Sequence, residues 1–181
     1  TSKPVFYAGK SFPLGASVSP DGVNFSVYSK NATGVELLLF ENSEVSQAAK
    51  RIEFNPVFNR TGNYWHVFVP GIKSGQIYGY QVAGPYQPDK GLRFDDKKIL
   101  LDPYGLSVCV PKNYNRKKAK QSGDNSVAAM KSVVIDPKNY DWEGDTPLKN
   151  PSSRTIIYEM HVGGFTRHPS SGIADDLKGT Y

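Results

Sequence analysis

The chain has 181 residues, of which 38% are apolar, and its 22 basic and 17 acidic residues give a formal net charge of +5. This length accommodates one complete domain of about 100 to 150 residues and an extension. A single cysteine, Cys109, excludes an internal disulfide, and no run of about 18 apolar residues is present that would predict a membrane span.

The first hundred residues are dominated by a period of two, which is typical of strands that bury one face. The apolar residues at positions 23, 25 and 27 alternate with Asn24, Ser26 and Tyr28. A second alternating run covers residues 35–40. Further strands are predicted over residues 51–54, 64–69 and 77–83. The short strands and frequent turns predict an all-β fold, an immunoglobulin-like antiparallel β-sandwich over residues 1–104.

The composition of the sequence changes near residue 105, where the strand-like alternation ends. Several prolines interrupt residues 102–151, and only residues 132–135 resemble a short strand. We therefore expect an irregular, extended connector over residues 105–153. Residues 155–162 (TIIYEMHV) have apolar side chains on both faces, a pattern typical of a buried strand in a barrel. Residues 154–181 are predicted to form a third region that begins with this strand.

One segment is strongly basic. Arg116, Lys117, Lys118 and Lys120 place four cations in five residues. Such a run is either a solvated loop or a surface that meets phosphates through charge.

Five segments, in order along the chain, resemble the N-terminal part of isoamylase-type glycogen and starch debranching enzymes of glycoside hydrolase family 13. They cover residues 9–40, 59–72, 78–86, 93–104 and 140–148. Residues 154–172 (RTIIYEMHVGGFTRHPSSG) resemble the first strand of the (β/α)8 barrel of those enzymes. The sandwich region resembles carbohydrate-binding module family 48. The resemblance implies a truncated chain in which most of the barrel is missing.

The resemblance also implies that catalysis belongs to the missing part. A retaining glycosidase needs two carboxyl groups about 5 to 5.5 Å apart, and in this family they follow later barrel strands. No matching motif occurs here, so we expect no catalytic residue and no cofactor. One cysteine and three histidines do not meet the spacing of a zinc site, so no metal is expected.

A glucan offers an apolar ring face and a rim of hydroxyls, so exposed aromatic rings with nearby amides and charges are its expected partners. Tyr78 and Tyr80 share a strand face with Val82 and are predicted to be core. Tyr140 and Trp142 are expected to dock against the barrel, with a role of Trp142 as a sugar platform left open. The candidate sugar-binding residues are Trp65, Tyr86, Asn63, Gln87, Lys90 and Arg93.

Two functional hypotheses follow. In the first, the chain is the noncatalytic N-terminal module of an isoamylase-like enzyme that hydrolyses α-1,6 branch linkages, or of a relative with glucanotransferase activity. Its partners would be α-glucans (glycogen, starch and malto-oligosaccharides) and the missing barrel, with no nucleic acid and no membrane, in a bacterial cytoplasm or a plastid. In the second, it is a basic β-sandwich adaptor that binds protein or nucleic acid through residues 116–120. The ordered family-like segments favour the first.

Overall fold

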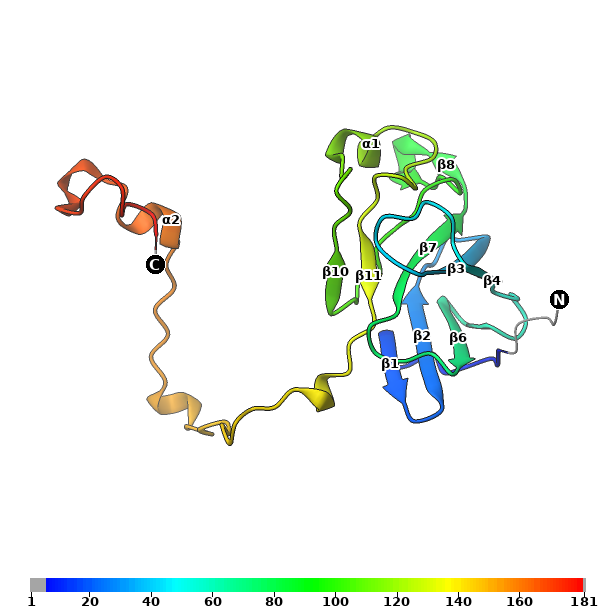
Figure 1. Cartoon of the computed structure of the whole chain (residues 1–181), viewed down its shortest axis with the longest axis horizontal. Coiled ribbons are helices and arrows are strands. Elements are labelled where there is room, and N and C mark those ends of the chain that lie inside the picture. The colour runs from blue at the N-terminus through cyan, green and yellow to red at the C-terminus, as the bar shows by residue number, and fades with distance from the viewer. Residues whose placement is uncertain (1–5, 181) are drawn as a thin grey trace. The chain divides into compact units, whose positions relative to one another are not determined.

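The computed structural model describes residues 6–180. The chain forms two compact units, Thr1–Tyr140 and Asp141–Tyr181. The first unit is mostly β-structure, and the second contains only short helical turns (Figure 1). Within residues 6–180, none of the helices has the length and apolar character needed to cross a membrane.

Four antiparallel strands form the first sheet, in the order β1-β2-β6-β5. They are β1 (Gly15–Ser19), β2 (Gly22–Tyr28), β5 (Arg60–Thr61) and β6 (Tyr64–Pro70). β2 pairs with β6 along its whole length, from Gly22 opposite Pro70 to Tyr28 opposite Tyr64. The strands predicted from alternation over residues 23–28 and 64–69 are therefore confirmed.

Five antiparallel strands form the second sheet, in the order β10-β11-β7-β3-β4. They are β3 (Gly34–Phe40), β4 (Lys50–Glu53), β7 (Ile77–Ala83), β10 (Ser107–Cys109) and β11 (Lys131–Val133). β3, β4 and β7 confirm three predicted strands. β10 and β11 come from residues expected to form a connector; β11 overlaps the short strand suspected there, whereas β10 carried no clear signal.

The two sheets pack face to face around one apolar core. The largest buried side chains include Trp65, Tyr78 and Tyr80, with relative exposures of 0%, 0% and 1%, which confirms the prediction that the two tyrosines are core. The rings of Phe25 and Tyr78 meet edge to face with their centroids 5.0 Å apart. Burial of each large side chain contributes about 1.5 to 3 kcal/mol, so this cluster dominates the stability of the sandwich.

The second sheet is also covered on its other face. Leu38 and Phe40 alternate with the core residues of β3 and pack with Ile99 and Ala129 in a second apolar cluster. The amine of Lys131 is buried over the Phe40 ring, 4.9 Å from its centroid, and donates to the carbonyl of Ser43 at 2.8 Å. Burial lowers the pKa of Lys131. The loops that contain residues 43, 99 and 129 therefore cover this sheet face.

Smaller elements complete the first unit. β8 (Tyr86–Gln87) and β9 (Leu92–Arg93) form a separate two-stranded sheet, with the 3-10 turn η1 (Pro88–Lys90) between them. The helix α1 (Arg116–Lys120) begins at Asn115, whose side chain accepts from the backbone N–H groups of Lys117 and Lys118. The turn η2 (Pro137–Asn139) lies near the end of the unit.

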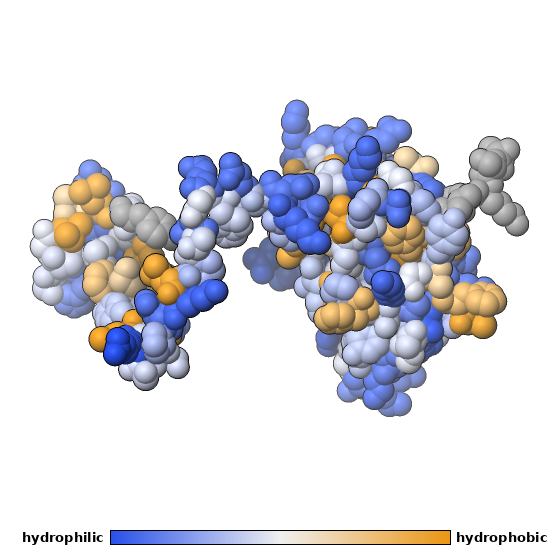
Figure 2. Space-filling model, turned by 90° about the horizontal axis from the view of Figure 1, so that it is seen from below, coloured by the Kyte–Doolittle hydropathy of each residue, from blue (hydrophilic) through white to orange (hydrophobic). Residues whose placement is uncertain are grey.

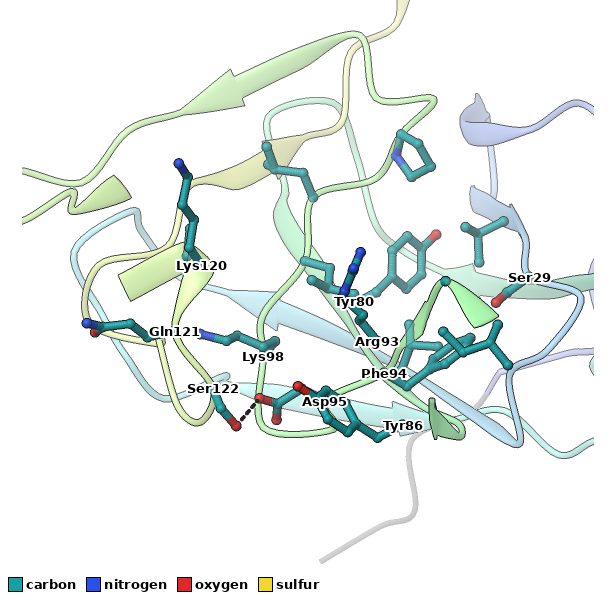
Figure 3. A pocket seen from close by; sticks show the side chains of 18 of the residues that line it. Ser29, Tyr80, Tyr86, Arg93, Phe94, Asp95, Lys98, Lys120, Gln121 and Ser122 are labelled. Carbon is teal, nitrogen blue, oxygen red and sulfur yellow. Dashed lines mark hydrogen bonds between the residues drawn. The ribbon is translucent and has the colours of Figure 1, made fainter. Parts of the chain in front are cut away.

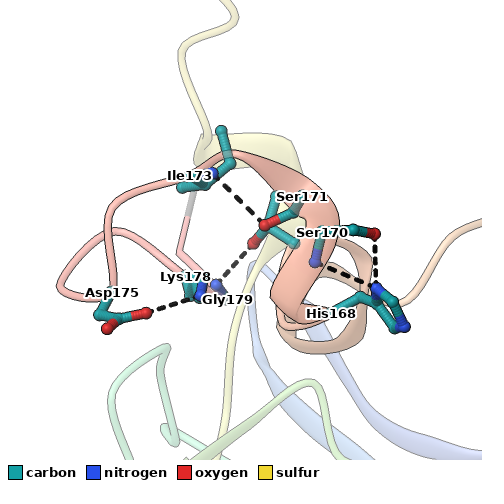
Figure 4. Close-up of polar contacts among 8 residues, drawn as sticks. His168, Ser170, Ser171, Ile173, Asp175, Lys178 and Gly179 are labelled. Atoms are coloured by element: carbon teal, nitrogen blue, oxygen red, sulfur yellow. Dashed lines mark hydrogen bonds and ion pairs between the residues drawn. The ribbon is translucent and has the colours of Figure 1, made fainter.

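The second unit contains η3 (Ser152–Arg154), α2 (Val162–Phe165) and η4 (Pro169–Ser171). Local polar contacts hold its turns (Figure 4). The Lys178 amine pairs with the Asp175 carboxylate at 2.6 Å, and His168 Nδ1 lies 2.7 Å from the Ser170 hydroxyl. These contacts join residues close in sequence, so they order turns without building a core.

The strand predicted over residues 155–162 is not present in the structure. Residues 155–161 have no regular secondary structure, and Ile156, Ile157 and Tyr158 are 96%, 85% and 77% exposed. A strand needs a neighbour for its N–H and C=O groups, and within residues 6–180 no segment pairs with this one. His161 instead caps α2, since its Nδ1 accepts from the Gly164 N–H at 3.0 Å. Figure 2 shows such exposed hydrophobic residues as patches on both units.

Candidate functional site

Trp65, predicted as a sugar platform, is part of the core. Its side chain has no exposed surface, its indole N–H donates to the carbonyl of Ser29 at 3.2 Å, and the guanidinium of Arg60 lies 4.7 Å from its ring centroid. A sugar stacks only on an accessible ring face, so the prediction for Trp65 is corrected. The alternation along β6 turns Trp65 inward and its neighbour Tyr64, 39% exposed, outward.

The β8–β9 hairpin presents most of the other predicted residues. Tyr86 is 69% exposed and lies directly opposite Arg93 in the pairing of β8 with β9. Residues opposite each other across an antiparallel pair project to the same side. Gln87 and Lys90 are exposed on the same hairpin. Tyr86 and Arg93 thus leave the hairpin on one face.

Asn63 lies apart from this pair, in the turn between β5 and β6. It is half-buried, and its backbone carbonyl accepts from the Ser29 N–H at 2.9 Å. Ser29 itself lines the groove described below, so Asn63 supports the groove wall from behind through the backbone. The structure therefore brings Tyr86 and Arg93 together and leaves Asn63 outside their immediate surroundings.

Tyr86 and Arg93 line a groove with a volume of about 750 Å³ (Figure 3). Its walls are the end of β2, the strand β7, the β8–β9 hairpin, the loop from 94 to 103 and residues 119–122. Apolar groups such as Phe94, Leu100 and Leu101 alternate with polar ones along the lining. This mixture suits a ligand with an apolar face and a hydroxylated edge.

Two polar contacts hold the loops around the groove. The amine of Lys98, which is 7% exposed, donates to the carbonyl of Lys118 in α1. The Asp95 carboxylate accepts from the Gly123 N–H at 2.7 Å and from the Ser122 hydroxyl at 3.2 Å. These hydrogen bonds, with that of Gly123 the largest contribution, lower the pKa of Asp95. Segments distant in sequence thereby form one wall.

The floor of the groove contains a polar atom without a partner. Tyr80 lines the groove, and within residues 6–180 its buried hydroxyl makes no hydrogen bond. In the view of Figure 3 its ring lies between Arg93 and Ser29. Burial raises the pKa of Tyr80 far above its usual range, so the hydroxyl keeps its proton and remains a donor. A buried polar group without a protein partner is uncommon.

The hydroxyl of the neighbouring Tyr78 has a hydrogen-bond partner, unlike that of Tyr80 among the described residues. Its hydroxyl donates to Asp102 Oδ2 at 2.8 Å, and Asp102 Oδ1 accepts from the Tyr104 N–H at 2.9 Å. Burial raises the pKa of both Tyr78 and Asp102. This pair joins β7 to the loop that carries the groove wall.

Tyr140 and Trp142, predicted to dock against a barrel, are 65% and 62% exposed. Their exposure is compatible with contact to another part of a larger protein, and the docking role stays a prediction. Sequence reasoning missed Lys120 and Asp95 as groove residues. The basic run was visible, but its position beside the hairpin was not, since 27 residues separate Arg93 from Lys120.

A family model described as carbohydrate-binding module 48 (isoamylase N-terminal domain) matches residues 13–105. The chain is 38% identical over 177 residues to chloroplastic isoamylase 1 of Oryza sativa subsp. japonica, covering 96% of this chain and 21% of the relative. It is 42% identical over 182 residues to the glycogen debranching enzyme of Serratia proteamaculans, covering 96% and 26%. The chain thus spans about a fifth to a quarter of the length of these relatives.

Among solved structures, the chain is similar to a pullulanase from Paenibacillus barengoltzii in complex with maltohexaose and α-cyclodextrin. The TM-score is 0.53 and the sequence identity 25%, over 96% of this chain and 22% of the pullulanase. The similarity extends beyond the segment that the family model matches.

Proposed function

The chain belongs to the carbohydrate-binding module 48 family, as an isoamylase N-terminal domain, and we propose that it is the noncatalytic N-terminal module of a debranching enzyme. In this proposal it associates with α-glucan through the Tyr86–Arg93 groove. The observation that carries the sugar contact is the exposed Tyr86 ring opposite Arg93 at the mouth of a partly apolar groove. The ring supplies a stacking face, and the guanidinium supplies donors for sugar hydroxyls.

The parent enzyme would hydrolyse α-1,6 branch linkages with residues that lie outside this chain. In this proposal, residues 1–104 are the immunoglobulin-like module and residues 105–153 are a connector whose β10 and β11 pair with the sheet. Residues 154–181 begin the (β/α)8 barrel, in which residues 155–162 gain strand neighbours. The names of the relatives, an isoamylase and a glycogen debranching enzyme, support this placement.

Tyr140 and Trp142 would contact the barrel, since large exposed aromatic residues are common in interfaces between protein surfaces. The relatives include a chloroplastic and a bacterial protein, which supports a plastid or a bacterial cytoplasm as the location of the parent. The exposed amide and amine of Gln87 and Lys90 would extend the sugar contact along the hairpin.

A titration of the 181-residue chain with maltoheptaose and β-cyclodextrin, followed by backbone amide shifts, tests the sugar contact. We expect saturable shifts centred on residues 86–95, and weaker binding by Tyr86→Ala. Tyr7→Ala is the matched control, because Tyr7 is a 59% exposed tyrosine of the same unit that does not line the groove. Unchanged spectra at about millimolar sugar, the weakest affinity in the usual scale, would overturn the groove as a glucan site.

The alternative, a basic adaptor for protein or nucleic acid, depends on α1. The exposed cations of α1 would bind a polyanion with steep salt dependence. Tight binding of a random single-stranded DNA that weakens sharply with salt, without any response to oligosaccharide, would favour this alternative.

A further inference from the structure

The groove has an excess of positive charge that a neutral sugar does not use. Three cationic side chains line it, namely Arg93, Lys98 and Lys120, against one carboxylate, that of Asp95. Lys98 already donates to the Lys118 carbonyl. Within the described part of the chain, Arg93 and Lys120 are exposed and make no side-chain hydrogen bond or ion pair. Two unpaired cations therefore face one cavity.

The basic run predicted from the sequence lies beside the same groove. The bond from Lys98 to the Lys118 carbonyl ties α1 to the loop that follows the hairpin. Ala119 and Lys120 of α1 line the groove, and Arg116 and Lys117 are exposed on the same short helix. Charges from residues far apart in sequence thus add to one local positive potential, which attracts anions.

The single carboxylate, that of Asp95, is attracted to the Lys98 amine, but it makes no ion pair with Arg93 or Lys120 among the described residues. Asp95 accepts from Ser122, Gly123 and the Lys97 N–H, so its oxygens point to the loops that it holds. Arginine grips a phosphate with two parallel N–H donors, while lysine contributes a point charge. An Arg and a Lys without partners are therefore suited to a phosphate group.

The groove also offers surfaces for a sugar ring next to these cations. Tyr86 lies opposite Arg93 across β8 and β9, a pairing in which Cβ atoms are about 4.5 to 5.5 Å apart. A ring stacked on Tyr86 would have its substituents within reach of the guanidinium. The side chain of Tyr80 lines the groove, while its hydroxyl is buried and lacks a partner within residues 6–180.

We propose that the groove preferentially binds a glucosyl unit that carries a phosphate monoester, with the ring on Tyr86, the phosphate bound by Arg93, and Lys120 adding positive charge elsewhere along the groove lining. This inference rests on the proposed glucan contact and adds the charge of the ligand. The same chemistry has two sources: a phosphorylated position on an α-glucan chain, or a free glucose phosphate.

The test compares the affinity of the 181-residue chain for four ligands by calorimetry and amide shifts. They are maltoheptaose, maltoheptaose carrying one 6-phosphate, glucose 6-phosphate and inorganic phosphate. We expect the phosphorylated oligosaccharide to bind at least about tenfold more tightly than the neutral one, with a preference that declines as salt screens the charges. Equally strong binding of glucose 6-phosphate would assign the site to the free sugar phosphate.

Charge variants decide whether these cations are responsible. In Arg93→Gln/Lys120→Gln, the ratio of the two oligosaccharide affinities should fall to about one. Lys10→Gln/Lys73→Gln removes the same charge at exposed positions that do not line this groove, and should keep most of the preference. An equal loss in both variants would mean a general charge effect and overturn the site.

The remaining outcomes separate the two proposals. Binding of maltoheptaose without any gain from the phosphate overturns this inference and leaves the proposed function intact. Binding of inorganic phosphate as tight as that of the phosphorylated oligosaccharide overturns the role of the sugar ring. Absence of binding by every ligand overturns both.

Discussion

Tyr78 and Tyr80 lie two residues apart on β7 and are both buried, yet within residues 6–180 only Tyr78 has a partner for its hydroxyl, the carboxylate of Asp102 at 2.8 Å. Their rings meet edge to face, with centroids 6.0 Å apart. One hydroxyl therefore makes a hydrogen bond that supports the fold, while the other is buried without one among the described residues.

Removal of these two hydroxyls should have opposite effects. Tyr78→Phe leaves a buried Asp102 oxygen without its donor and should lower the free energy of unfolding by about 1 to 3 kcal/mol. Tyr80→Phe removes an unsatisfied group and should be neutral or slightly stabilising, and because this hydroxyl is buried away from the groove surface, binding of maltoheptaose should not change. Urea unfolding and sugar titration of both variants check this. Equal destabilisation by the two would contradict the assignment.

Two carboxylates should give the stability of the protein opposite dependences on pH. Burial raises the pKa of Asp102 above 3.8, so its contribution is fully present below that value and is lost as pH rises through the folded-state pKa. Hydrogen bonds lower the pKa of Asp95 below 3.8, so its contribution is present above that value and is lost as pH falls.

Urea unfolding of the unmutated 181-residue chain and of the variants Asp102→Asn and Asp95→Asn, between about pH 3 and pH 7, measures these dependences. The free energy of unfolding of the unmutated chain should exceed that of Asp95→Asn by an amount that decreases toward pH 3. The unmutated chain should exceed Asp102→Asn in free energy of unfolding by the largest amount near pH 3. Parallel pH profiles for all three proteins would refute this pair of assignments.

Substitution of Trp65 should affect stability, whereas substitution of Tyr86 should affect sugar binding. Trp65→Phe loses packing and the hydrogen bond to Ser29, and should cost about 1 to 3 kcal/mol of unfolding free energy. Tyr86→Ala alters an exposed side chain and should change stability by less than about 0.5 kcal/mol, while weakening sugar binding about fivefold through the lost stacking. Thermal unfolding and titration are the two measurements. A large stability loss in Tyr86→Ala would count against a binding role.

Gly84 precedes the β8–β9 hairpin and Gly91 lies in its turn, and each position requires glycine for a different reason. A Cβ at Gly84 would lie 2.5 Å from the Phe94 ring, whereas one at Gly91 meets nothing within 4 Å but occupies a backbone φ of +76°. Gly84→Ala should therefore displace Phe94 and cost about 1 to 3 kcal/mol, and Gly91→Ala should cost about 1 kcal/mol from backbone strain alone. Aromatic ring shifts of Phe94 should change in the first variant only.

The strands were largely predictable, because alternation reports which face of a strand is buried. β7 coincides with its predicted range, and β2, β3 and β6 each differ from the predicted range by one residue at one end. β10 was missed because its three residues lie in a proline-rich stretch and pair only with β11. The strand predicted at residues 155–162 was wrong for this structure, since pairing depends on neighbours that local sequence does not supply.

Tyr86 and Arg93 were named as candidates from the sequence, and their role in sugar binding stays a prediction. Their pairing across β8 and β9 is a finding of the structure. The burial of Trp65 depends on Ser29 and on packing of two sheets, and periodicity alone did not say which of Tyr64 and Trp65 faces the core.

The sequence by itself determined the family and most of the sandwich strands, because these follow from short-range patterns and ordered motifs. Only the tertiary structure decided that Lys120 and Arg93 line one groove, that Trp65 is core and that the Tyr80 hydroxyl has no partner among the described residues. Those facts depend on long-range contacts, such as that of Lys98 with the Lys118 carbonyl, whose formation is set by how two sheets and their loops close around one core.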